Sequence, residues 1–138
     1  MQIFSIGDTN FDVDVAKSRI SVAARADGMR EINIRIEADD EAFLRLTEDE
    51  DAPWSWALYP PSFILQGLLL AGTDGAPVQM LAVDASNADC ECSLYMMDYH
   101  DVSDLRLVEL SAQRLALTGK VDFDGKDLPF AIDMRRPA

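Results

Sequence analysis

Apolar residues recur at every second position along two neighbouring stretches, residues 20–25 and residues 32–37. An alternation of this period is typical of β-strands with one buried face. The two stretches flank an Asp-Gly dipeptide, which favours a hairpin turn. A three-residue loop ending at Gly28 keeps all apolar positions on one face, whereas a loop shorter by one residue would mix them with polar ones. We therefore expect a β-hairpin in which Val22 pairs with Ile32.

The same alternation returns over residues 115–134 and predicts a second hairpin. The apolar positions that share a face are Leu115, Leu117, Val121 and Phe123 on one strand and Phe130, Ile132 and Met134 on the other. We expect Phe123 to lie opposite Phe130, with an even-numbered loop between the strands. Gly119 indicates a bulge or a point of close packing. A preceding strand around residues 105–108 completes a three-stranded meander.

Residues 41–47 predict one or two helical turns in the middle of the chain. Asp39 or Asp40 is the expected N-cap, because a carboxylate there accepts a hydrogen bond from the first free backbone amides. Phe43, Leu44 and Leu46 form the expected apolar side of this helix.

Residues 62–71 are long enough for either a helix or a strand, and both remain open from the sequence. We favour a strand because Gly67 is unfavourable inside a helix. Residues 72–77 are typical of a hairpin loop leading into a strand over residues 78–83, and residues 91–97 predict another strand.

The full pattern predicts a single domain over residues 1–138 that is mostly β. We expect an antiparallel β-sandwich or barrel of about nine to eleven short strands, because turn signals recur roughly every ten residues. At most one short helix is expected, near residues 40–47.

The net charge of −13 is unevenly distributed along the chain. Residues 46–105 contain eleven acidic residues and no Lys or Arg, so they carry −11 of that charge. A field of one sign attracts a basic partner and accelerates its association. Nucleic acids and anionic membranes would instead be repelled, since phosphate binding requires a basic surface. The charge therefore indicates a basic protein partner, no nucleic acid and no membrane.

Trp54 and Trp56 are separated by one residue and follow a cluster of acidic residues. One interpretation is an aromatic recognition surface, because Trp is a frequent anchor in protein interfaces. The other places both indoles on the inward face of a strand, where they cover apolar area. The candidate partner-binding residues are Glu48, Asp49, Glu50, Asp51, Trp54, Trp56, Asp98 and Asp101.

Residue types that carry catalysis or bind metals are sparse in this chain. His100 is the single histidine, and no nucleophile motif or phosphate-binding glycine loop accompanies it. Cys90 and Cys92 with one histidine fall short of a tetrahedral metal site. The acidic residues around Gly125 depart from the spacing of a calcium loop and favour a hairpin turn. We expect no catalytic residue, no metal and no cofactor.

These observations favour an acidic protein-binding module for a basic partner. A concrete form is a cytoplasmic immunity or inhibitor protein against a cationic toxin. Residues 1–20 contain no secretory signal, which makes the cytoplasm the expected location if the chain is complete. The alternative is a small-molecule-binding β-barrel lined by Trp, Met and Phe side chains. A third hypothesis is an enzyme that uses His100. The oligomeric state is left open.

Overall fold

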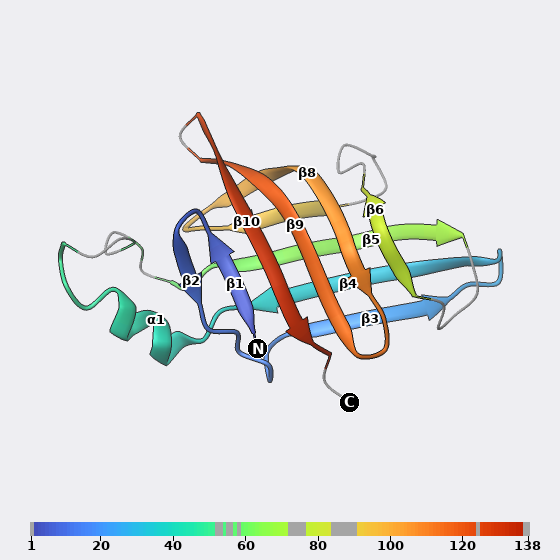
Figure 1. Ribbon diagram of the computed structural model, residues 1–138, viewed down its shortest axis with the longest axis horizontal. Helices are drawn as coiled ribbons and strands as arrows, with labels where there is room; N and C mark the ends of the chain where they lie inside the picture. Colours follow the sequence, from blue (N-terminus) through green and yellow to red (C-terminus); the bar gives the residue numbers. More distant parts are fainter. Residues whose placement is uncertain are drawn as a thin grey trace.

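The computed structural model describes residues 2–51, 54, 57, 59–71, 77–83, 91–123 and 125–136. Within these residues it contains ten strands and one short helix, so the prediction of a mostly β fold with one helix is confirmed (Figure 1). The helix is α1 (Asp40–Leu46). The strands are β1 (Ile3–Ile6), β2 (Thr9–Phe11), β3 (Arg19–Ala24), β4 (Met29–Glu37), β5 (Ser62–Ala71), β6 (Val78–Ala82), β7 (Glu91–Tyr95), β8 (Tyr99–Leu110), β9 (Arg114–Phe123) and β10 (Lys126–Arg135).

All ten strands belong to one antiparallel sheet that curls into a half-barrel. Its order is β2-β1-β10-β9-β8-β7-β5-β4-β3, and β6 pairs with β8 outside this path. Figure 1 shows β1, β10 and β9 crossing over β3, β4 and β5. The long strand β8 joins the two layers, because its first residues pair with β7 and its later ones with β6 and β9. Asp104, at φ 51°, lies where the register between β8 and β9 shifts, as expected for a bulge that bends a strand.

The core fills the space between the two layers. Phe63 on β5 and Phe130 on β10 meet with ring centroids 5.6 Å apart. Burial of each such side chain contributes about 1.5–3 kcal/mol to folding.

α1 is too short to cross a membrane, and the described residues include no other helix that could.

The predicted hairpin over β3 and β4 is confirmed in its register. Val22 pairs with Ile32, and the backbone N–H of Arg25 donates to the carbonyl of Met29 at 2.8 Å. Three residues therefore form the loop, and Gly28 adopts φ 79°. The alternation of apolar residues was sufficient to select this register, because a slip of one residue would expose the apolar face.

The predicted register of the β9–β10 hairpin is wrong, although its faces are correct. Phe123 lies opposite Lys126 rather than Phe130, so only two residues connect the strands. Gly125, the second of them, has φ 77°, which suits such a short turn. Phe130 instead lies opposite Gly119, where a Cβ atom would stand 2.7 Å from its ring. The true register therefore differs from the prediction by an even number of residues, which leaves every side chain on its predicted face.

Residues 62–71 form the strand β5, as favoured from the sequence. Gly67, at φ 77°, forms a bulge opposite Asn33, whose Oδ1 accepts a hydrogen bond from the Gly67 N–H at 3.0 Å. The expected hairpin between residues 62–71 and residues 78–83 is wrong, because β6 pairs with β8. β4 lies along one edge of β5, and β7 pairs with Ser62–Gln66 on the other, whereas β6 adds to β8 beside β9. The loop assigned to that hairpin falls mostly outside the described residues.

An ion pair connects β9 and β10 at the end opposite their turn. The Nε and Nη2 atoms of Arg114 donate to the two carboxylate oxygens of Asp133 at 2.8 and 2.7 Å. These hydrogen bonds, and then the positive charge itself, hold the pKa of the Asp133 carboxyl below its ordinary value. Water reaches both side chains, so the pair contributes only modestly to stability.

Asp133→Asn should lower the midpoint of urea unfolding slightly at pH 7. A carboxyl with a depressed pKa stabilises the folded state above its unfolded-state value of about 3.9, and this contribution disappears as the pH falls through the folded-state value. The difference between wild type and variant should therefore hold above about pH 5, shrink as the pH falls below about 4, and close only below the folded-state value. Asp127→Asn, an exposed site on the same strand, is the control. A difference that does not shrink between pH 5 and pH 3 would contradict this assignment.

Candidate interaction surface at the α1 end of the sheet

Three segments that are distant in the sequence meet at one end of the sheet. The Ala38 N–H, just before α1, donates to the carbonyl of Pro61 at 3.1 Å, just before β5. Ser62 then pairs with Tyr95 at the end of β7. Figure 1 shows α1, the start of β5 and the β7–β8 turn together at the left of the molecule. We call this surface the α1 end; it comprises α1 with residues 47–51 and Trp54, residues 59–62, and residues 95–101.

α1 is held by one cap and one buried side chain. Asp39 is the N-cap, and its carboxylate accepts a hydrogen bond from the Ala42 N–H at 3.0 Å. Phe43 packs beside Phe11 of β2, with ring centroids 6.2 Å apart. The expected burial of Leu44 and Leu46 is wrong, since 64% and 38% of these residues are exposed. A helix of seven residues that lies at the edge strand β2 has only one face against the sheet.

Asp39→Ala should destabilise α1 locally. Loss of an N-cap costs about 1 kcal/mol, and a helix this short has little stability of its own. Hydrogen exchange of the α1 amides should accelerate about fivefold, while exchange in β9 and β10 stays unchanged. Glu41→Ala, an exposed acid in the same helical turn, is the matched control. Equal acceleration in both variants would show that Asp39 does not act as a cap.

The acidic residues after α1 lie on an exposed turn. Glu48, Asp49, Glu50 and Asp51 are all exposed. The Asp49 carboxylate accepts a hydrogen bond from the Asp51 N–H at 3.0 Å, which is an Asx turn. This bond orders the backbone that presents the carboxylates to solvent.

Trp54 connects this acidic turn to the sheet. Its indole N–H donates to Oγ1 of Thr9 at 3.1 Å, and its ring meets Phe11 edge-on at 5.0 Å. The residue is half-buried against the core, with φ 70°. Trp54 therefore positions the turn on β2 and retains some exposed surface. Trp56 lies outside the described residues.

The β7–β8 turn carries the second acidic group. Asp98 is exposed, and its carboxylate accepts a hydrogen bond from the Tyr99 N–H at 2.8 Å. Asp101 is exposed on β8, where it pairs with Ser93. Among the described residues no hydrogen bond or ion pair joins Asp98 or Asp101 to the acidic turn after α1. The two acidic groups thus share one end of the sheet without forming a single cluster.

Exposed apolar side chains accompany these acids, and the sequence interpretation missed them. Of the six large apolar side chains exposed in the described part of the chain, four belong to the α1 end: Leu44, Leu46, Tyr59 and Tyr99. Tyr59 and Tyr99 are 59% and 63% exposed. Grouped apolar exposure is typical of interaction sites, whereas isolated exposed residues are ordinary. In the sequence, this apolar exposure is indicated by Tyr59, which stands next to Pro60.

His100 contacts a backbone carbonyl and an aromatic ring among the residues described. Its Nδ1 lies 3.1 Å from the carbonyl oxygen of Asp122, and its ring meets Phe123 edge-on at 5.3 Å. No carboxylate, hydroxyl or thiol of a described residue bonds to the imidazole. The described residues also contain no group of three or more side chains that could hold a metal ion. Cys92 is half-buried against the core, and Cys90 lies outside the described residues.

Described residues line several hollows. One, of about 710 Å³, is an open groove across β3, β4 and β5. A second, of about 90 Å³, lies between β2 and α1, and a third, of about 410 Å³, lies beside the Arg114–Asp133 pair.

Comparison of the chain with protein-family models, with curated proteins and with solved structures finds no match.

Proposed function

We propose that this protein is a protein-binding module that engages a basic partner through the α1 end. One observation carries the proposal: exposed acids and exposed apolar side chains occur together at that end. The acids are Glu48, Asp49, Glu50, Asp51, Asp98 and Asp101, and the apolar side chains are Leu44, Leu46, Tyr59 and Tyr99.

These two kinds of side chain supply different parts of an interface. Protein interfaces combine a desolvated centre rich in tyrosine with a polar rim, and charges on the rim guide the encounter. The two tyrosines are suited to the centre and the carboxylates to the rim. Lys17, a nearby base, is neutralised by Asp40 at 3.0 Å, so it adds little positive charge to this surface.

A more specific form of the proposal is a cytoplasmic immunity or inhibitor protein. The active site of a toxin that cleaves nucleic acid is basic, because it must bind phosphate. An acidic surface that carries tyrosine anchors is suited to cover such a site and exclude the substrate. The small size of the domain is compatible with this role.

Affinity capture with matched charge variants tests the proposal. Immobilised protein is exposed to a lysate of its source cells, and captured proteins are quantified by mass spectrometry. The test variant is Glu48→Lys with Glu50→Lys. The control is Glu31→Lys with Glu91→Lys, which alters the net charge equally on strands β4 and β7, outside the α1 end.

If the proposal is correct, the wild type and the control variant capture a basic protein that the test variant does not retain. This protein should elute as the salt concentration is raised. Captured proteins that are all acidic, or that bind both variants equally, would refute it.

A further inference from the structure

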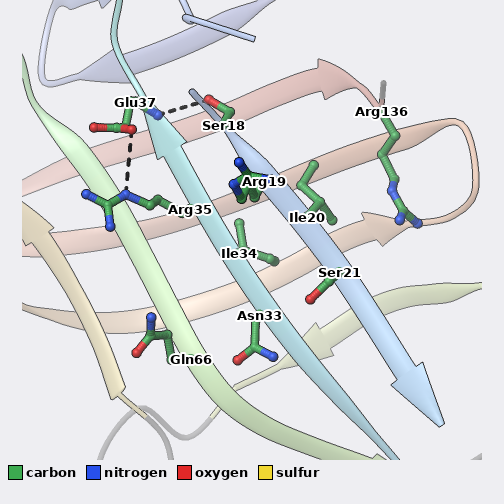
Figure 2. Close-up of a pocket in the computed structure, with 10 residues that line it drawn as sticks. All are labelled: Ser18, Arg19, Ile20, Ser21, Asn33, Ile34, Arg35, Glu37, Gln66 and Arg136. Atoms are coloured by element: carbon green, nitrogen blue, oxygen red, sulfur yellow. Dashed lines mark hydrogen bonds and ion pairs between the residues drawn. The ribbon is translucent and has the colours of Figure 1, made fainter. Parts of the chain in front are cut away.

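A groove of about 710 Å³ runs along β3, β4 and β5 and is also lined by Arg136 beyond β10, whereas none of the α1-end acids lines it. Figure 2 shows the side chains that line it. Three of them are arginines, Arg19, Arg35 and Arg136, and one is a carboxylate, Glu37. The groove is therefore locally positive in a chain whose net charge is −13.

Two of these arginines are direct cross-strand neighbours. Arg19 on β3 pairs with Arg35 on β4, so both side chains project from the same face of the sheet. Like charges directly opposite each other destabilise a sheet. A bound anion would neutralise part of this positive charge and reduce the repulsion.

The described residues of the protein satisfy few of the hydrogen-bond donors of these two arginines. Glu37 approaches Nε of Arg35 only to 3.6 Å, which is too long for a hydrogen bond (Figure 2). Arg19 forms no ion pair or hydrogen bond with any other described residue. Both guanidinium groups therefore keep most of their donors available to a ligand.

The neighbouring side chains add further donors. Asn33 lies two residues from Arg35 on the same face, and its Oδ1 already accepts the Gly67 N–H at 3.0 Å. This bond assigns the amide orientation and leaves the NH₂ group as a donor. Ser21 pairs with Asn33 across β3 and β4 and contributes a hydroxyl. Figure 2 shows Arg19, Arg35, Ser21 and Asn33 on adjoining parts of these two strands.

We propose that Arg19 and Arg35, with Asn33 and Ser21 beside them, form a binding site for the oxyanion group of a small molecule. The group is a phosphate or a carboxylate, because a guanidinium donates to either in a bidentate fashion. The site lies outside the α1 end and does not depend on the function proposed above.

Binding of defined anions tests this site directly. Inorganic phosphate and citrate are titrated separately into the full chain, with sodium chloride at equal ionic strength as the reference. Backbone amide and arginine Nε–Hε NMR shifts report binding, and the melting temperature is measured in parallel. Arg19→Gln is the test variant, and Arg25→Gln, an exposed arginine just beyond β3 and outside the groove, is the control.

Phosphate, citrate or both should shift the amide signals of β3 and β4 and raise the melting temperature beyond the effect of chloride. Arg19→Gln should weaken that binding at least about tenfold, and Arg25→Gln should leave it unchanged. In chloride alone Arg19→Gln should melt no lower than wild type, since it removes a like-charge pair. A response to phosphate alone assigns a phosphate-bearing ligand, and a response to citrate alone assigns a carboxylate.

Three results would overturn the site. The first is no response to either anion beyond that of chloride. The second is an equal response in wild type and Arg19→Gln. The third is an equal loss in Arg25→Gln, which would indicate general charge screening.

Discussion

Reversing the charge of Glu48 and Glu50 together to lysine should weaken binding of the basic partner on the order of 100-fold at physiological salt. The two carboxylates stand on the exposed turn after α1, where the Asx turn at Asp49 and the indole of Trp54 hold the backbone against β2. Each substitution replaces an attraction with a repulsion at the proposed interface. Because rim charges act mainly on the encounter, most of the loss should lie in the association rate constant.

Surface plasmon resonance of the captured partner, measured at several salt concentrations, checks this expectation. The control variant, Glu31→Lys with Glu91→Lys, should lose less than about threefold, because both charges lie outside the α1 end and salt screens charges that are remote from an interface. Salt should weaken wild-type binding steeply and binding of the test variant only slightly. Equal losses in the two variants would show that net charge, rather than the α1 end, governs association.

Gly119→Ala should destabilise the fold by about 1–3 kcal/mol, the largest effect expected from a single added methyl group. A Cβ atom at this position would lie 2.7 Å from the Phe130 ring and 3.4 Å from the carbonyl oxygen of Ser103. Phe130 is almost fully buried, so its ring cannot move aside without disturbing the core between the two layers. Urea unfolding, followed by circular dichroism, measures the change.

Two further variants make the Gly119 result specific to this contact. Thr118→Ala, on the opposite face of β9, should change stability by no more than about 0.5 kcal/mol. Phe130→Leu shortens the side chain opposite Gly119, so Gly119→Ala should cost less in that background. Additive effects of Gly119→Ala and Phe130→Leu would contradict the close contact and the register that creates it.

The two hairpins show what periodicity can and cannot determine. In β3 and β4 the competing register differed by one residue and would have exposed the apolar face, so the pattern alone was decisive. In β9 and β10 the competing registers differed by an even number of residues, and every side chain kept its face in both. The fit of the Phe130 ring over Gly119 and the short turn ending at Gly125 both favour the true register, and periodicity contains neither kind of information.

The candidate interaction surface was only partly predictable. The acids of residues 46–105 could be counted from the sequence, but their grouping depends on non-local pairing of β5 with β7. The sequence predicts that Leu44 and Leu46 are buried, because apolar residues in a short helix usually face inward. Their exposure follows from the position of α1 beside the edge strand β2, which no local pattern reveals.

The Arg19–Arg35 pair, in contrast, could have been predicted. The hairpin register that matches Val22 with Ile32 also places Arg19 opposite Arg35. The residues outside 46–105 have a net charge of only −2, the remainder after residues 46–105 contribute −11 of the −13. This small total gives no sign that two arginines lie opposite each other. Comparing charges across the predicted strand pairs would have found it.

Hydrogen–deuterium exchange of the complex with the captured basic partner shows which residues of this protein the partner covers. Binding through the α1 end should slow exchange at residues 40–51, at Tyr59 and at residues 96–101 in the complex, with β3 and β6 unchanged. Protection confined to β3, β4 or β6, with the α1 end exchanging as in the free protein, would contradict it.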